Sequence, residues 1–134
     1  MADIRKVTDD FSVAPQLSPA DMAEAARLGF KLAINNRPDG EAPGQPTSAQ
    51  MEAAARAAGL DYVQIPFAGR PTAEQADAVR AAAEGASGPV LAFCRSGTRS
   101  ITAWSLGQAR AGRSPRELVD LAADAGYDLS AMLG

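Results

Sequence analysis

The chain has 134 residues, enough to bury one hydrophobic core and too few for two domains of ordinary size. Its net charge of −3 provides no basic field to gather nucleic acid or anionic lipid, and the absence of histidine excludes Ser-His-Asp and Cys-His catalysis and histidine-ligated metals within this chain. Its single cysteine excludes an internal disulfide and a Cys-x-x-Cys redox pair. From the length we expect one domain over residues 1–134, and from the missing histidine and the single cysteine we expect no cofactor and no metal site.

The N-terminal third is predicted to contain a hairpin and a helix. Residues 4–7 and 11–14 are short apolar runs separated by polar residues, a pattern typical of a hairpin. Ser18 is expected to cap a helix that has Pro19 in its first position and ends at Gly29.

Three further strands are expected over residues 31–35, 61–65 and 89–93. The last of them is wholly apolar, as a buried central strand would be. Residues 36–46 contain three prolines and two glycines, which predicts an irregular loop of the kind that often has a function.

The remaining helices are predicted from their caps. Thr47 or Ser48 opens an alanine-rich helix, Thr72 and Gln75 form a capping box, and a second capping box is expected at Ser114. The expected helices cover residues 48–58, 72–83, 100–111, a segment beginning at 114, and a short final turn at 129–133.

The alternation of strands and helices predicts an α/β fold, a three-layer sandwich with a mostly parallel sheet of four to five strands and helices on both faces. Ligands of such sheets bind at the carboxyl ends of the strands. Three loops leave those ends, at residues 36–46, 66–71 and 94–100, and we expect them to border one site.

The third loop carries the predicted chemistry, and it reads Cys94-Arg95-Ser96-Gly97-Thr98-Arg99-Ser100. A strand, a tight glycine-containing loop and a helix start aim backbone N–H groups and the positive end of a helix dipole at one point, which favours an anion or a thiolate. A lone cysteine is usually a buried, inert residue, but such a residue does not need two arginines and three hydroxyl side chains beside it. We predict that Cys94 is the nucleophile, that Arg99 assists it, and that the anion is bound by Arg95, Ser96, Gly97, Thr98 and Ser100, whose hydroxyls donate to the thiolate.

Together with Ile34-Asn35-Asn36-Arg37-Pro38-Asp39-Gly40-Glu41 and Pro43-Gly44-Gln45-Pro46, this loop resembles the phosphatase-like domain family associated with beta-lactamase hydrolase-like proteins. The resemblance extends from about Asp10 to Leu133. It implies the fold of the cysteine-dependent dual-specificity phosphatases, and it leaves the reaction open.

Loop length separates two reactions. Arg99 follows Cys94 by five positions, whereas the cysteine phosphatases that the fold resembles place the arginine six positions on, with a histidine where this chain has Phe93. The spacing is similar to that of the rhodanese loop, which suits a persulfide sulfur. The sequence therefore favours sulfur transfer through a Cys94 persulfide, from a small anionic sulfur donor to an external thiol.

The alternative is a phosphatase that acts on a phosphoester through a phosphocysteine intermediate, and a third hypothesis is a thiol-based sensor or anion-binding module. A phosphatase needs a general acid, and residues 66–71 contain none. Asp39 is the candidate acid, weighed evenly against a role in a turn, whereas Glu41 is expected to be a solvated charge. Asn36 and Arg37 either line the anion pocket or brace the loop.

The sequence contains no apolar run long enough to span a membrane and no signal peptide. We therefore expect a cytoplasmic protein with no membrane or nucleic-acid partner.

Overall fold

The computed structural model describes residues 2–133, which form a five-stranded sheet in the order β1-β2-β5-β3-β4. The β1–β2 hairpin is antiparallel, and the pairs β2–β5, β5–β3 and β3–β4 are parallel. The strands are β1 (Arg5–Thr8), β2 (Phe11–Ala14), β3 (Leu32–Asn35), β4 (Asp61–Gln64) and β5 (Val90–Phe93). The predicted hairpin, strands and mostly parallel sheet are confirmed.

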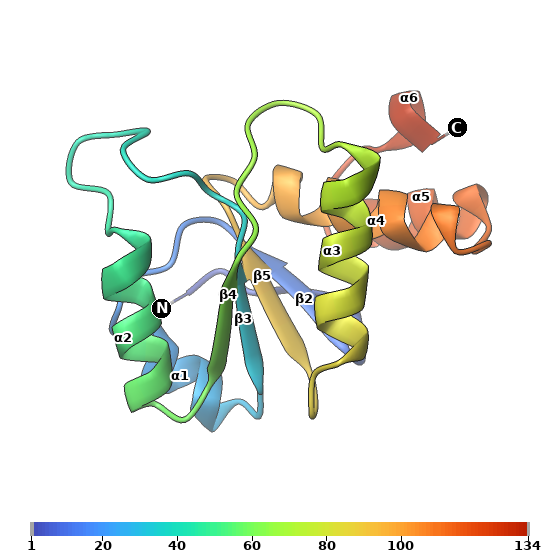
Figure 1. The fold of residues 1–134 in the computed structure, drawn as a ribbon. Coiled ribbons are helices and arrows are strands. Elements are labelled where there is room, and N and C mark those ends of the chain that lie inside the picture. The colour runs from blue at the N-terminus through green and yellow to red at the C-terminus, as the bar shows by residue number, and fades with distance from the viewer. Residues whose placement is uncertain (1, 134) are drawn as a thin grey trace.

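Helices cover both faces of the sheet and complete the predicted three layers (Figure 1). The first two helices lie on one face, and the next three lie on the other. The helices are α1 (Asp21–Arg27), α2 (Ser48–Ala57), α3 (Ala73–Glu84), α4 (Thr98–Arg110), α5 (Pro115–Asp124) and α6 (Ser130–Leu133).

The central position of β5 in the sheet explains why the sequence of this strand is wholly apolar. Val90 and Ala92 point into the core shared with α3, α4 and α5, whereas Leu91 and Phe93 point into the core shared with α1 and α2. Since side chains alternate between the two faces of a strand, a strand covered on both faces must be apolar at every position. This burial fixes β5, and with it the start of the loop that follows.

Three helix starts differ from the sequence prediction. Residues 18–20 form a turn, in which the Asp21 carboxylate accepts from the Ser18 N–H at 2.7 Å, and α1 begins at Asp21. Helix α4 begins two residues early because Gly97 adopts φ 91° and lets the chain turn directly into the helix. In the described chain, Ser114 precedes α5 without a side-chain cap, since Glu117 pairs with Arg113.

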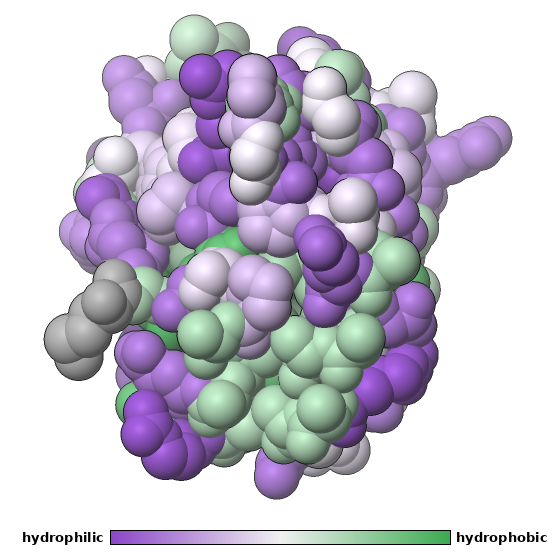
Figure 2. All heavy atoms as spheres, turned by 90° about the vertical axis from the view of Figure 1, so that its left-hand side faces the viewer, coloured by the Kyte–Doolittle hydropathy of each residue, from purple (hydrophilic) through white to green (hydrophobic). Residues whose placement is uncertain are grey.

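The outward side of the α1–α2 layer carries many small apolar side chains. Figure 2 shows a pale green area over the lower half of this side, bordered by hydrophilic residues. Ala53 and Ala57 of α2 are exposed, and Leu28, just after α1, is 60% exposed. Within residues 2–133, every helix falls short of the length and apolar character required for a membrane span.

Candidate active site

Four strand ends converge at one edge of the sheet. The last residues of β2, β5, β3 and β4 stand side by side in the register, as Ala14, Phe93, Asn35 and Gln64. The segments that leave these strands therefore emerge together. The sequence analysis anticipated three of them, and the fourth is the short segment 15–17 after β2, which contributes Gln16.

Cys94 lies at the centre of this edge, directly after β5. It is fully buried, and its Sγ accepts a hydrogen bond from the Gly97 backbone N–H at 3.1 Å. The predicted donation to the sulfur is wrong for Ser96, whose hydroxyl donates to the Thr98 hydroxyl at 3.0 Å. Among the described residues, the sulfur accepts no hydrogen bond from the Thr98 hydroxyl either. The Ser100 side chain is buried with no hydrogen-bond partner among the described residues. Backbone geometry thus supplies the contact that the sequence assigned to hydroxyls.

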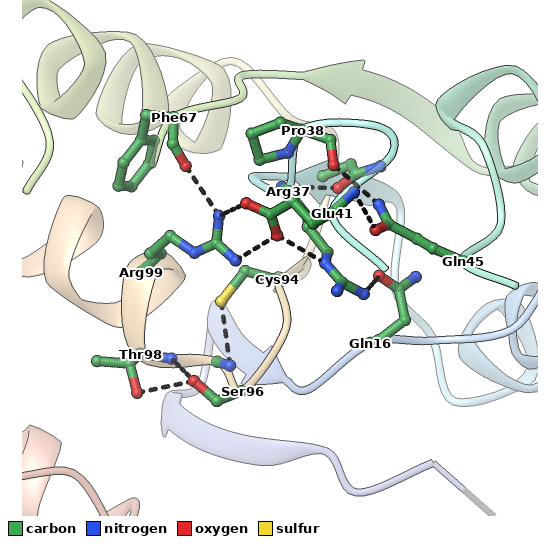
Figure 3. A network of polar contacts seen from close by, with 12 residues as sticks. Gln16, Arg37, Pro38, Glu41, Gln45, Phe67, Cys94, Ser96, Thr98 and Arg99 are labelled. Atoms are coloured by element: carbon green, nitrogen blue, oxygen red, sulfur yellow. Dashed lines mark hydrogen bonds and ion pairs between the residues drawn. The ribbon is translucent and has the colours of Figure 1, made fainter. Parts of the chain in front are cut away.

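Arg99 lies in the first turn of α4, and its guanidinium group crosses to the loops that follow β3 and β4 (Figure 3). Its Nη1 and Nη2 donate to the two carboxylate oxygens of Glu41 at 2.9 and 2.8 Å, and Nη1 also donates to the Phe67 carbonyl at 3.0 Å. The hydrogen bonds to Glu41 raise the pKa of Arg99, and the nearby Cys94 raises it further. Arg99 is therefore a fixed cation beside the sulfur.

Arg37 is a second cation on the same carboxylate. Its side chain is 5% exposed, and its Nε donates to Glu41 Oε1 at 2.8 Å, while Nη1 donates to Gln16 Oε1 at 3.1 Å. Hydrogen bonds from Arg99 and then from Arg37 lower the pKa of Glu41 to about 2. The expectation that Glu41 is a solvated charge is wrong, because two guanidinium groups hold it in the site. Arg37 thus binds a residue of its own loop as well as Gln16, and both of the roles left open for it, lining an anion pocket and bracing the loop, stay open.

Other residues of the 36–46 loop brace it. The Asn36 side chain donates to the Ile65 carbonyl at 2.9 Å, and the Gln45 amide bonds both the Pro38 carbonyl and the Glu41 N–H. Asp39 accepts from the Ser48 N–H at the start of α2 at 2.8 Å. This contact gives Asp39 a structural role at a helix start, and no contact of Asp39 with Cys94 is found in the described chain.

Arg95, at the outer side of the loop, is exposed, and its backbone carbonyl accepts from the Gln16 N–H at 3.3 Å. On the opposite side, the Tyr127 hydroxyl donates to the Ser96 carbonyl at 2.9 Å. Sequence reasoning did not identify Tyr127 or Gln16. Gln16 could have been identified as a candidate, because it follows a strand that pairs in parallel with β5 and ends at the same edge of the sheet.

The arrangement is suited to binding an oxyanion beside a sulfur nucleophile. The Glu41 carboxylate accepts three charge-assisted hydrogen bonds from two guanidinium groups, the geometry in which arginine also binds phosphate. The two arginines therefore form a position at which an oxyanion can bind, and in this structure the Glu41 carboxylate occupies it.

Known proteins resemble this chain in sequence and in fold. Residues 3–111 match the family model described as the phosphatase-like domain of beta-lactamase hydrolase-like protein. A beta-lactamase hydrolase-like protein of Agrobacterium fabrum is 43% identical over 129 residues, which cover 94% of this chain and 30% of that protein. The chain thus spans under a third of the length of this curated relative.

Two solved structures illustrate the fold. A Neisseria meningitidis protein, provisionally described as a phosphatase, is 33% identical with a TM-score of 0.86, over 97% of this chain and 93% of that one. Kinase associated phosphatase, in a structure whose catalytic-site cysteine is replaced by serine, is 13% identical with a TM-score of 0.72, over 94% of this chain and 83% of that one. The cysteine-phosphatase-like fold is confirmed, as is the expectation of an enzyme with a cysteine nucleophile. The similarities favour the phosphatase alternative, and none of them points to sulfur transfer.

Proposed function

Because the chain belongs to the phosphatase-like domain family of beta-lactamase hydrolase-like proteins, we propose that it is a phosphomonoesterase that acts through a phosphocysteine intermediate on Cys94. One observation carries the proposal: two guanidinium groups, from Arg37 and Arg99, hold a single carboxylate beside the buried sulfur. In the proposed complex, the phosphoryl oxygens of the substrate replace the Glu41 carboxylate on these two cations.

The second arginine offsets the short loop. A loop with one residue fewer has less backbone to wrap a tetrahedral phosphoryl group, which is why the sequence favoured sulfur transfer. Arg37 reaches the site from the loop after β3, and Arg99 from the helix after β5. Two cations on separate elements share the charge of a phosphate dianion, so the cysteine loop does not have to enclose it alone.

The proposed reaction has two steps. The Cys94 thiolate attacks phosphorus, the S–P bond forms, the P–O ester bond breaks, and the leaving oxygen takes a proton from solvent. Water then attacks the phosphocysteine and gives up a proton to solvent, the S–P bond breaks, and inorganic phosphate leaves while the thiolate is restored. The Gly97 N–H and the Arg99 guanidinium are positioned to stabilise the sulfur anion at the start and end of this cycle.

Leaving-group chemistry defines the substrate class. Residues 66–71 contain no acidic side chain, Asp39 binds the start of α2, and Glu41, whose pKa is about 2, is ionised near neutral pH. None of these three places supplies a protonated acid to the leaving oxygen. The enzyme is therefore expected to hydrolyse aryl phosphates, whose phenolate leaves readily, and to act poorly on alkyl phosphates.

The first test compares an aryl phosphate, an alkyl phosphate and thiosulfate, each with the wild-type protein and with Cys94→Ser. We expect phosphate release from the aryl phosphate only, and its loss in the variant by a factor of at least about 10³, since the nucleophile is removed.

Intact-protein mass spectrometry after acid quenching distinguishes the alternatives. A gain of one phosphoryl group on the wild-type protein supports the proposal. A gain of one sulfur atom from thiosulfate, released by cyanide, would instead establish a sulfurtransferase. If the protein gained neither a phosphoryl group nor a sulfur atom, the sensor hypothesis would be the one that remains. The cytoplasm remains the proposed location, on the composition of the sequence alone.

A further inference from the structure

One peptide group connects the nucleophile loop to the C-terminal part of the chain. The Gly97 N–H donates to Cys94 Sγ at 3.1 Å, and the carbonyl of the same peptide, that of Ser96, accepts from the Tyr127 hydroxyl at 2.9 Å. The two hydrogen bonds therefore lie on opposite ends of one amide, and Tyr127 acts on the sulfur through it.

The loop is shaped to admit this tyrosine. A Cβ atom at position 97 would overlap Tyr127 Oη, so the hydroxyl occupies the space that a side chain at Gly97 would fill. The ring is held from its other side, where the Arg5 guanidinium lies 5.5 Å from the ring centroid and also donates to the Ala125 carbonyl at 3.2 Å. Tyr127 is thus fixed between β1 and the nucleophile loop.

Tyr127 is in the protonation state that this role needs. Burial raises the pKa of Tyr127, the Arg5 guanidinium lowers it, and the charges of Cys94 and Asp3 raise it. The net change is a rise, so the hydroxyl keeps its proton and remains a donor. A hydrogen bond to a peptide carbonyl polarises the amide and strengthens the N–H as a donor.

We propose that Tyr127 is a positioning residue for the nucleophile, one that orients and polarises the Ser96–Gly97 peptide so that its N–H stabilises the Cys94 thiolate. The inference rests on the proposed role of Cys94 and adds a residue beyond the 3–111 segment that matches the family model. Among the described residues, the Tyr127 hydroxyl makes no hydrogen bond to the sulfur itself, and it acts through the Ser96–Gly97 peptide that lies between them.

The test is a pH titration of the thiolate by its ultraviolet absorbance in Tyr127→Phe, with the spectrum of the matching Cys94→Ser protein subtracted. Phenylalanine keeps the ring beside Arg5 and removes only the hydroxyl. Cys94 is the single cysteine, so the difference spectrum reports one group. We expect the midpoint of the titration to rise by about 0.5 pH unit, which corresponds to about threefold less thiolate below the midpoint.

Tyr62→Phe is the matched control. It is the other tyrosine of the chain, it is buried, and its hydroxyl bonds the side chains of Asn35 and Ser48, away from residues 94–99. Its titration midpoint should equal that of the wild type. The Gly97 amide proton in an NMR spectrum gives a second measurement, which should move upfield in Tyr127→Phe and stay in place in Tyr62→Phe.

An unchanged midpoint in Tyr127→Phe, or equal shifts in both variants, would overturn the proposal. The titration needs no substrate, so its outcome is independent of whether the protein hydrolyses phosphoesters. A shifted midpoint without phosphatase activity would refute the proposed function and leave the positioning role intact.

Discussion

Glu41 holds two arginine side chains together, and both of them are largely buried: Arg37 is 5% and Arg99 is 17% exposed. In Glu41→Gln, the carboxylate charge is lost and two neighbouring cations remain without it. We expect the free energy of unfolding to fall by about 2 kcal/mol, in the range found when one partner of a largely buried ionic contact is removed. Urea denaturation near neutral pH measures this change.

The same variant should bind phosphate more tightly. If substrate oxygens replace the Glu41 carboxylate, removing the charge removes a competitor, and the inhibition constant of inorganic phosphate should fall by a factor of about 5 to 10. Glu52→Gln is the control, since Glu52 pairs with Arg56 on the exposed face of α2 and should change neither stability nor phosphate affinity by much. Weaker phosphate binding in Glu41→Gln would show that Glu41 orients Arg99 for the substrate instead of competing with it.

The placement of Cys94 and Arg99 at the end of β5 and the start of α4 could be predicted from the sequence, because it follows from a local pattern of seven residues between a strand and a helix. Glu41 could not, because its pairing with Arg99 joins residues 58 positions apart and exists only when β3 and β5 lie side by side. In the sequence, Asp39 and Glu41 are both acidic residues of the same loop. In the fold they have different contacts: Asp39 accepts from the N–H at the start of α2, and Glu41 pairs with the two arginines.

At the level of elements, Gly97 is where strand, loop and helix meet. It has φ 91°, a conformation that disfavours any side chain, and its missing Cβ makes room for Tyr127. In Gly97→Ala we expect a loss of about 3 kcal/mol of stability, from backbone strain together with the steric overlap, and a loss of most phosphatase activity because the loop is displaced.

Gly112, just after α4, is the matched control. It has φ +100° and open space around the position of a Cβ. Gly112→Ala should therefore lose only the backbone contribution, about 1 kcal/mol, with activity retained. Thermal and urea unfolding of both variants give the comparison, and equal losses in the two would mean that contact with Tyr127 is unimportant at position 97.

Elements with strong local signals were predicted well. The capping box predicted at Thr72 forms, with Thr72 accepting from the Gln75 N–H and the Gln75 side chain reaching back. A capping box that was not predicted forms at Thr47 with Gln50, at a helix start that the sequence placed at Thr47 or Ser48. The box at Ser114 does not form, because Arg113 offers Glu117 a charged partner that competes with the backbone. A capping motif states which hydrogen bonds are available, and neighbouring charges decide which of them form.

On the scale of the whole molecule, the first strand is connected to the nucleophile loop through a residue near the C-terminal end of the described chain. Arg5 in β1 contacts Ala125 and the ring of Tyr127, and Tyr127 contacts the loop itself. The sequence could not reveal this link, since residues 5 and 127 come together only through the packing of α5 against β1. The C-terminal helices therefore complete the catalytic edge of the sheet as well as its core.

The acid stability of the whole protein should depend on Glu41. Its pKa is about 2 in the folded protein, against an ordinary value of 4.5, so the folded state holds the ionised form more strongly than the unfolded state does. The resulting stabilisation is fully present above about pH 4.5 and is lost as the pH falls from there toward about 2, with a total on the order of 2 kcal/mol once solvent screening of this partly exposed carboxylate is included. Urea denaturation across this pH range should show the wild type losing its stability advantage over Glu41→Gln. Glu52→Gln should follow the wild type throughout, and parallel curves for wild type and Glu41→Gln would place the acid-sensitive group elsewhere in the molecule.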